Sequence, residues 1–285
     1  MVKLIECPRD AMQGLTEFIP TVVKAAYINQ LLKVGFDTID FGSFVSPKAI
    51  PQLRDTAEVL EQLDLSETSS KLLAIVANQR GAEDACRFDE IQYLGFPFSI
   101  SETFQQRNTN SSIEEALGRV EAIQNLCVAH GKEAVIYISM AFGNPYGDPW
   151  NSDVAMKWTE RLVNDHGIRI IALADTIGVS NPENISYLFS TLIPAFSEVD
   201  FGAHLHTQPH NWEEKVKAAH DSGCQRFDAA MKGFGGCPMA EDELVGNMAT
   251  ENLVSYFDRQ QIDLNLDRDA FDKSFGQATG VFPLH

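Results

Sequence analysis

The stretch VDFGAHLHT, residues 199 to 207, has the alternating pattern of a β-strand. Successive side chains of a strand point to opposite faces, so His204 and His206 share a face and stand about 7 Å apart at their Cα atoms. Two imidazoles at this spacing can bind one metal ion; the alternative is a pair of core histidines satisfied by backbone hydrogen bonds. The other face would pack outward against helices and carries Phe201, Ala203 and Leu205.

Seven similar runs precede or follow this one, and most are continuously apolar, as expected for parallel strands covered by helices. Helical patterns separate the runs, for example at residues 20–32, 113–130, 155–165 and 183–192. With 285 residues, the chain is near the typical size of a (β/α)8 barrel. We therefore predict a single-domain (β/α)8 TIM barrel over residues 1–285. The seven further runs are 3–8, 38–44, 71–78, 90–96, 133–142, 168–176 and 226–234.

The charge and cysteine content limit the choice of partners and compartment. The chain has 22 Lys and Arg against 40 Asp and Glu, a formal net charge of -18, which repels phosphate backbones, so we expect no nucleic acid partner. Neither a targeting segment nor an apolar stretch of membrane-spanning length is visible, so we expect no membrane partner. Five widely spaced cysteines without a Cys-x-x-Cys pair suit a reducing cytosol. A soluble, cytoplasmic protein is the expectation.

Polar side chains collect where the predicted strands end. In a (β/α)8 barrel these carboxyl ends and the loops after them form the functional face. We expect Arg9 and Asp10 at the end of the first strand and Asn247 after the last. The other candidates on this face are Asp40, Ser43, Asn78, Arg80, Glu102, Tyr137, Asp175, His204, His206 and Cys237.

Four of these residues form a candidate metal site: Asp10, His204, His206 and Asn247. They offer two oxygens and two nitrogens, which leaves two positions of an octahedron open for a substrate. A set without thiolate suits Mg2+ or Mn2+, while Zn2+ stays an alternative because histidine favours it. A substrate with a hydroxyl beside a carboxylate or carbonyl would fill both open positions. The competing interpretation of Asn247 is an ordinary turn after Gly246.

Five segments resemble, in order and spacing, the 3-hydroxy-3-methylglutaryl-CoA lyase family. This family belongs to the barrel metallolyases, whose relatives include the isopropylmalate and homocitrate synthases. The resemblance covers essentially the whole chain, and the GGCP motif followed by GN is its most specific part. The segments are IECPRDAMQG (5–14), FGSFVSPKAIPQ (41–52), HLH (204–206), GFGGCP (233–238) and GNMATENLV (246–254).

The resemblance implies a reaction and a role for individual residues. The reaction is retro-Claisen cleavage of 3-hydroxy-3-methylglutaryl-CoA to acetyl-CoA and acetoacetate. Asp10, His204, His206 and Asn247 match the metal ligands, and Asp10 is also a candidate base for the substrate hydroxyl. Arg9 would neutralise the enolate, and Cys237, on a mobile loop, would join His204 in proton transfer. Supporting polar positions near the substrate match Gln13, Asp40, Ser43, Tyr137 and Asp175.

Several positions depart from the family pattern. Asp40 stands where glutamate is customary, Ala11 where glycine is usual and Thr207 where aspartate often follows the second histidine. None removes a predicted metal ligand, and together they indicate a divergent branch. A lyase acting on another 3-hydroxyacyl-CoA, a Claisen-condensing acyltransferase and a non-catalytic acyl-CoA-binding barrel remain alternatives. The family's tendency to dimerise makes a homodimer the expected assembly.

Overall fold

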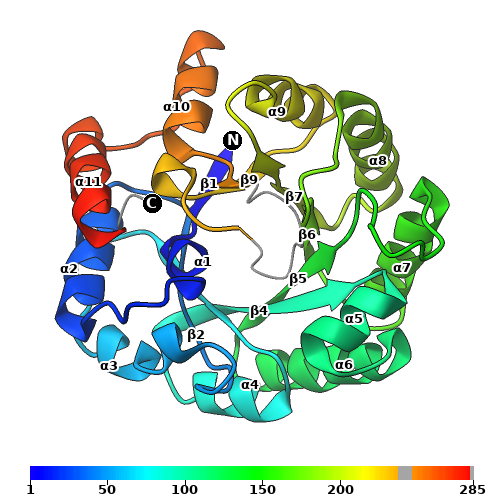
Figure 1. Cartoon of the computed structure of the whole chain (residues 1–285), viewed down its shortest axis with the longest axis horizontal. Helices are drawn as coiled ribbons and strands as arrows, with labels where there is room; N and C mark the ends of the chain where they lie inside the picture. Colours follow the sequence, from blue (N-terminus) through cyan, green and yellow to red (C-terminus); the bar gives the residue numbers. More distant parts are fainter. Residues whose placement is uncertain (237–245, 283–285) are drawn as a thin grey trace.

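The computed structural model describes residues 1–236 and 246–282. Eight parallel strands close into a barrel in the order β1, β2, β3, β4, β5, β6, β7 and β9 (Figure 1). All eight predicted strands are present, which confirms the (β/α)8 fold. Their bounds are Lys3–Glu6 (β1), Thr38–Ser43 (β2), Lys71–Ile75 (β3), Ile91–Ser99 (β4), Glu133–Ser139 (β5), Ile170–Ala174 (β6), Asp200–His204 (β7) and Arg226–Ala229 (β9).

Helices surround this barrel, and α11 lies beside α2, so the last helix packs against the first part of the ring (Figure 1). Each of the four helical patterns named from the sequence corresponds to one of these helices. The helices are α1 (Pro8–Gln13), α2 (Thr21–Leu32), α3 (Thr56–Leu60), α4 (Gln79–Ala85), α5 (Glu102–Thr109), α6 (Ile113–Ala129), α7 (Ser152–Asn164), α8 (Pro182–Ala195), α9 (Trp212–Asp221), α10 (Thr250–Arg259) and α11 (Arg268–Val281).

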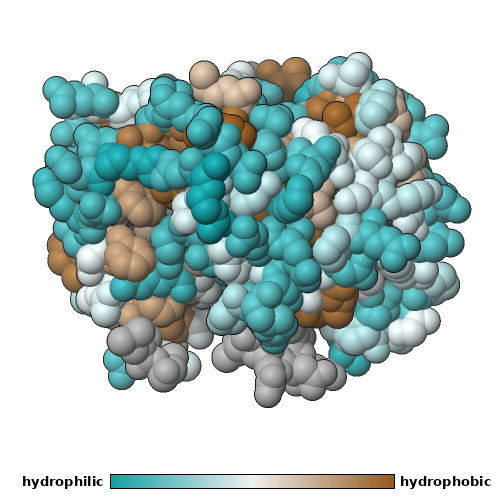
Figure 2. Space-filling model, turned by 90° about the horizontal axis from the view of Figure 1, so that it is seen from above, coloured by the Kyte–Doolittle hydropathy of each residue, from teal (hydrophilic) through white to brown (hydrophobic). Residues whose placement is uncertain are grey.

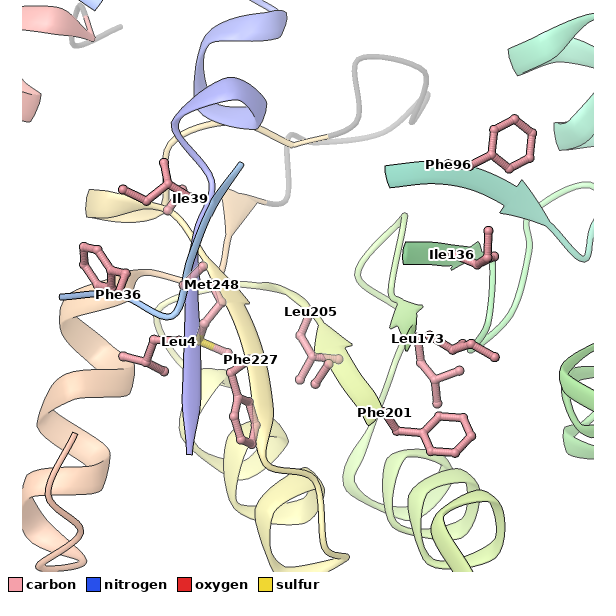
Figure 3. Packing of buried hydrophobic residues seen from close by; sticks show 14 of the residues in the cluster. Leu4, Phe36, Ile39, Phe96, Ile136, Leu173, Phe201, Leu205, Phe227 and Met248 are labelled. Carbon is pink, nitrogen blue, oxygen red and sulfur yellow. The ribbon is translucent and has the colours of Figure 1, made fainter. Parts of the chain in front are cut away.

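Alternation along the strands separates two hydrophobic layers. The predicted outward set of the seventh strand, Phe201, Ala203 and Leu205, is buried in the main core. Figure 3 shows Phe201 and Leu205 among the packed hydrophobic side chains. A smaller cluster fills the barrel interior with side chains such as Tyr93 and Tyr137. Because the interior is packed, the polar groups at the carboxyl ends lie above a layer of closely packed side chains.

The prediction of one continuous strand over residues 199–207 was wrong. β7 ends at His204, and His206–Thr207 form a separate short strand, β8. β8 pairs antiparallel with β10 (Gly246–Asn247), where Asn247 faces His206. The chain leaves the parallel ladder at Leu205 because its hydrogen-bonding groups then pair with a segment that returns after β9. The two imidazole rings nevertheless remain neighbours, with centroids 5.6 Å apart.

Arg9 and Asp10 also lie elsewhere than the sequence suggested. β1 ends at Glu6, and both residues belong to the short helix α1, in which Pro8 occupies the first turn. Proline has a fixed φ and no N–H to donate to a neighbouring strand, so it ends the ladder and favours a helical first turn. The carboxylate and the guanidinium therefore project from a helix just beyond the strand end.

The surface is largely hydrophilic in the view of Figure 2. Hydrophilic side chains cover most of this face and hydrophobic ones are scattered among them. Within the described ranges, no helix combines the length and the apolar character needed to cross a membrane.

Candidate active site

A cavity of about 450 Å³ opens where the strands end. Its wall includes the last residue of β3, β5, β6 and β7, as expected for the functional face of a barrel. Six predicted site residues line the cavity directly: Arg9, Asp10, Gln13, Tyr137, His204 and His206. The remaining wall is mostly apolar and includes Val45, Ala49, Ile50, Ile75, Ala77, Pro97, Phe104 and Ala174, with Asn108, Thr109, Ser139 and Thr176 as polar members.

Asp10, His204 and His206 form a compact cluster in this wall. One ligand atom of each lies within 4.8 Å of the other two. The Nε2 atom of His204 is 3.7 Å from Oδ2 of Asp10. A carboxylate and two imidazoles at such separations match the donor set of a divalent cation, so the residues fit the metal that the sequence suggested.

The protonation of Asp10 and His206 also suits a cation. Burial, and then the neighbouring His204 ring, lower the pKa of His206 to about 4, so its imidazole is neutral at neutral pH and keeps a lone pair. Burial raises the pKa of Asp10, but Arg9 and then the two histidines outweigh burial, and the pKa lies below its usual range. The cluster therefore presents an anionic oxygen beside a neutral nitrogen.

Asn247 reaches the cluster from β10. Its Nδ2 donates to the carbonyl oxygen of Phe234 at 2.9 Å, and its side chain also hydrogen-bonds to Asp10. Gly235 allows this approach because a Cβ at that position would lie 2.7 Å from Asn247 Nδ2 and 2.9 Å from the Asp10 carbonyl oxygen. Cys237, two residues further on, lies outside the described residues.

Arg9 is held by three neighbours at the edge of the cavity. Its Nε and Nη2 atoms both donate to Asp40 Oδ2, at 3.0 and 2.6 Å. Its Nη1 donates to Gln13 at 2.9 Å and to Asp10 at 3.3 Å, and Gln13 in turn donates to Asp10. Burial raises the pKa of Asp40 to about 6, although Arg9 opposes the rise. The Arg9 guanidinium is therefore a buried cation whose orientation is fixed by its hydrogen bonds.

Three predicted polar positions lie behind the cavity wall. Asp175 accepts hydrogen bonds from Lys215 at 2.8 Å and from Ser180, and the Lys215 ammonium also donates to the His206 carbonyl oxygen at 3.0 Å. The Ser43 hydroxyl donates to the Ile75 carbonyl oxygen at 3.2 Å, and Asn78 caps α4. These residues shape the backbone around the site, and the cavity wall does not include them.

One residue of the site was missed. Asp228, on β9, is buried, and its Oδ2 lies 3.1 Å from Nδ1 of His204, its direct neighbour in the parallel ladder. A signal was present, because Arg226 and Asp228 are charged residues at alternate positions near the start of a predicted strand, next to Phe227, Ala229 and Ala230. Charges at such positions are buried and therefore need partners.

These features define a class of protein: a (β/α)8-barrel enzyme whose polar cluster surrounds a cavity at the carboxyl ends of the strands. Comparison with known proteins makes the assignment specific. The HMGL-like family model matches residues 2–273, and the chain belongs to this family. It is an enzyme of the hydroxymethylglutaryl-CoA (HMG-CoA) lyase type, a carbon–carbon lyase.

Relatives and solved structures agree with this membership. The HMG-CoA lyase of Bacillus subtilis is 32% identical over 259 residues, which cover 91% of this chain and 85% of that protein. The crystal structure of the HMG-CoA lyase from Bacillus subtilis aligns with a TM-score of 0.91 at 30% identity and covers 100% of this chain and 96% of that one. An HMG-CoA lyase from Acinetobacter baumannii, solved with coenzyme A and 3-methylmalate, has a TM-score of 0.90 at 29% identity and covers 99% of this chain and 91% of that one.

Proposed function

We propose that this enzyme cleaves 3-hydroxy-3-methylglutaryl-CoA to acetyl-CoA and acetoacetate with the help of a divalent metal. Asp10, His204, His206 and Asn247 would hold the ion, and the observation that carries the proposal is the convergence of the first three within 4.8 Å at the cavity wall. Mg2+ or Mn2+ suits this oxygen and nitrogen set, with Zn2+ as the alternative. When bound, such an ion lowers the pKa of a coordinated hydroxyl.

Each step of the bond cleavage is assigned to a group of the protein. The proton of the C3 hydroxyl leaves to Asp10, the C2–C3 bond opens, and the former C3 becomes the ketone of acetoacetate. The electron pair becomes the enolate of acetyl-CoA, which takes up a proton through His204 and Cys237. Arg9 faces this negative charge, and because Asp40 already fixes the guanidinium, little reorganisation is needed when the charge develops.

The substrate class is also part of the proposal. Coenzyme A and 3-methylmalate occupy the Acinetobacter baumannii relative, which supports an acyl-CoA ligand here. The largely apolar wall around Val45, Ile50 and Ile75 suits an acyl group that carries a methyl substituent beside its polar atoms. We further propose a cytoplasmic homodimer, which rests on cysteine usage and on family resemblance.

The deciding experiment is an assay of acetoacetate formed from HMG-CoA, with and without a chelator. We expect turnover that the chelator abolishes and that added Mn2+ or Mg2+ restores. Full activity in metal-stripped protein would overturn the metal-dependent mechanism. A panel of other 3-hydroxyacyl-CoAs tests the acyl group, and release of free coenzyme A from acetyl-CoA plus α-keto acids would identify a condensing enzyme instead.

A further inference from the structure

A second trio of metal-binding side chains lies against the first and shares one residue with it. Cys7, His204 and Asp228 each offer a ligand atom within 4.8 Å of the other two. Cys7 and Asp228 are buried, and His204 is largely so. This trio contains a thiol, whereas the set at the cavity wall contains only oxygen and nitrogen donors. The trio with the thiol therefore favours a softer ion than the set at the cavity wall does.

The barrel ladder fixes the three side chains at one place. Asp228 pairs with Ile5 on one side and with His204 on the other. Cys7 follows Ile5 by two residues, so it shares the face of Ile5, and its N–H donates to the Ala229 carbonyl oxygen at 2.8 Å. The three residues therefore lie on, or directly after, the neighbouring strands β1, β9 and β7. The backbone pairing of these strands brings the three side chains together.

Two donor atoms of the trio lack a strong partner. Asp228 Oδ1 is buried and finds no hydrogen-bond donor in the described part of the chain. The Cys7 sulfur makes a long contact of 3.7 Å to the Ile5 carbonyl oxygen, which is a weak interaction. A buried carboxylate oxygen without a partner is costly. An ion held between these atoms would satisfy both.

We propose that Cys7, His204 and Asp228 form an inhibitory site for a borderline or soft divalent cation of the Zn2+ class. Thiolate, imidazole and carboxylate are the ligands that Zn2+ takes in proteins, and three protein ligands with one water complete a tetrahedron. Mg2+ and Mn2+ prefer oxygen ligands and gain little from a thiolate. The inference rests on the proposed function in one respect, since inhibition has meaning only if the first set supports turnover.

Inhibition follows from the chemistry of His204. The imidazole nitrogen that faces Asp228 is Nδ1, at 3.1 Å, whereas Nε2 faces Asp10. A neutral imidazole has one nitrogen with a lone pair and one with a proton. We call the trio of Cys7, His204 and Asp228 the inner site, and the set at the cavity wall the outer set. Coordination through Nδ1 places the proton on Nε2, so the outer set loses one of its nitrogen donors. An ion in the inner site therefore weakens binding of Mg2+ or Mn2+ at the outer one.

Charge favours a cation at the inner site. The carboxylates of Asp228, Asp40 and Asp10 surround the Cys7 sulfur, and Arg9 is the opposing cation. Binding of Zn2+ replaces the thiol proton, which leaves to solvent, and the negative surroundings then stabilise the ion.

The first test uses Co2+ as a spectroscopic probe in the full chain. The reference protein and both of its variants carry Cys237→Ala, so the thiol of Cys237, which lies outside the described residues, cannot give the signal. We expect a thiolate-to-Co2+ charge-transfer absorption that Cys7→Ala abolishes. The matched control is Cys224→Ala, because Cys224 is also buried but its sulfur contacts only the carbonyl oxygens of Phe201 and Arg226 among its described contacts. Absorption that survives Cys7→Ala, or disappears with Cys224→Ala, overturns the proposal.

The second test measures inhibition with Cys237 intact. We expect Zn2+ to inhibit Mn2+-supported turnover, and Cys7→Ala to raise the half-inhibiting Zn2+ concentration by roughly tenfold or more. Equal inhibition of both proteins would contradict the proposal. If Cys7→Ala fails to fold, Cys7→Ser replaces it in both tests. A Co2+–thiolate signal in a chain without lyase activity would refute the proposed function and leave the metal site standing.

Discussion

The Nδ1 atom of His204 and the Oδ2 atom of Asp228 are 3.1 Å apart, and the two residues are direct neighbours in the ladder between β7 and β9. A carboxylate that accepts from one imidazole nitrogen fixes the tautomer and directs the other nitrogen outward. Here the outward atom is Nε2, which lies 3.7 Å from Asp10. Asp228 therefore orients a candidate metal ligand from beneath the cavity.

Replacement of Asp228 by asparagine should weaken metal binding. The amide cannot match the charge-assisted hydrogen bond to Nδ1, so we expect the affinity for Mn2+ to fall by roughly 10- to 100-fold. Calorimetric titration measures this. Asp55→Asn is the matched control, since Asp55 is a buried carboxylate paired with Lys24. The control should lose stability and keep its Mn2+ affinity; equal affinity in Asp228→Asn and the wild type would refute the role.

The contact between Asp40 and Arg9 should matter for turnover more than for folding. Asp40→Asn loses the charged, bidentate contact that directs the guanidinium, and a displaced cation costs about 100-fold in kcat. Asp40→Glu keeps the carboxylate and restores the residue customary in the family, so we expect most activity to return. Steady-state kinetics separate kcat from KM. A normal kcat in Asp40→Asn would show that Arg9 needs no such support.

Gly235 should tolerate no side chain. Its φ is +93°, and an added Cβ would collide with the Asn247 amide and the Asp10 backbone. Gly147 also has a positive φ, of +76°, but nothing lies within 4 Å of its Cβ position. We expect Gly147→Ala to lose about 1 kcal/mol of unfolding free energy to backbone strain, and Gly235→Ala to lose more because of its collisions. Only Gly235→Ala should also lose Mn2+ affinity and turnover; similar behaviour of the two would remove Gly235 from the site.

Glu6 should make stability depend on pH. It accepts hydrogen bonds from Met231 and Thr250, yet burial raises its pKa from 4.5 to about 8 despite them. Between these values the folded protein holds a proton that the unfolded chain has lost. The free energy of unfolding therefore falls as pH rises from 4.5 toward 8, by up to about 1.4 kcal/mol per unit.

Glu6→Gln isolates this contribution, because the amide keeps an acceptor for Met231 and cannot ionise. Denaturant unfolding from pH 5 to 9 should show the variant gaining stability relative to the wild type as pH rises, with no further gain above the folded pKa. Curves that stay parallel across this range would show that Glu6 does not titrate as described.

The barrel was predictable because each strand and helix shows a pattern within its own short stretch of sequence. Most strands are continuous apolar runs, as parallel strands covered by helices require. The break at Leu205 was not predictable, because it depends on pairing between His206 and Asn247, forty-one residues apart in the numbering. The sequence also cannot tell which of several rim residues faces the cavity. Asp175, for example, turns to Lys215 instead.

Asp228 illustrates a different failure. The strand that contains it was predicted, and alternation places Arg226 and Asp228 on one face. Phe227, Ala229 and Ala230 around them give the pattern of a covered strand, so the two charges alone do not identify a site. The contact with His204 exists only because β7 and β9 become neighbours when the barrel closes. A buried charge in a predicted strand is therefore a reason to ask which group on the adjoining strand it meets.

Electron paramagnetic resonance of Mn2+ titrated into the purified, metal-free protein examines the proposed coordination set most directly. The wild type should bind one tightly held Mn2+ per chain, and Asp10→Ala and His206→Ala should lose it while circular dichroism shows an intact barrel. Tight, stoichiometric binding that persists in both folded variants would mean that the ion lies elsewhere, and the lyase mechanism built on these residues would have to be abandoned.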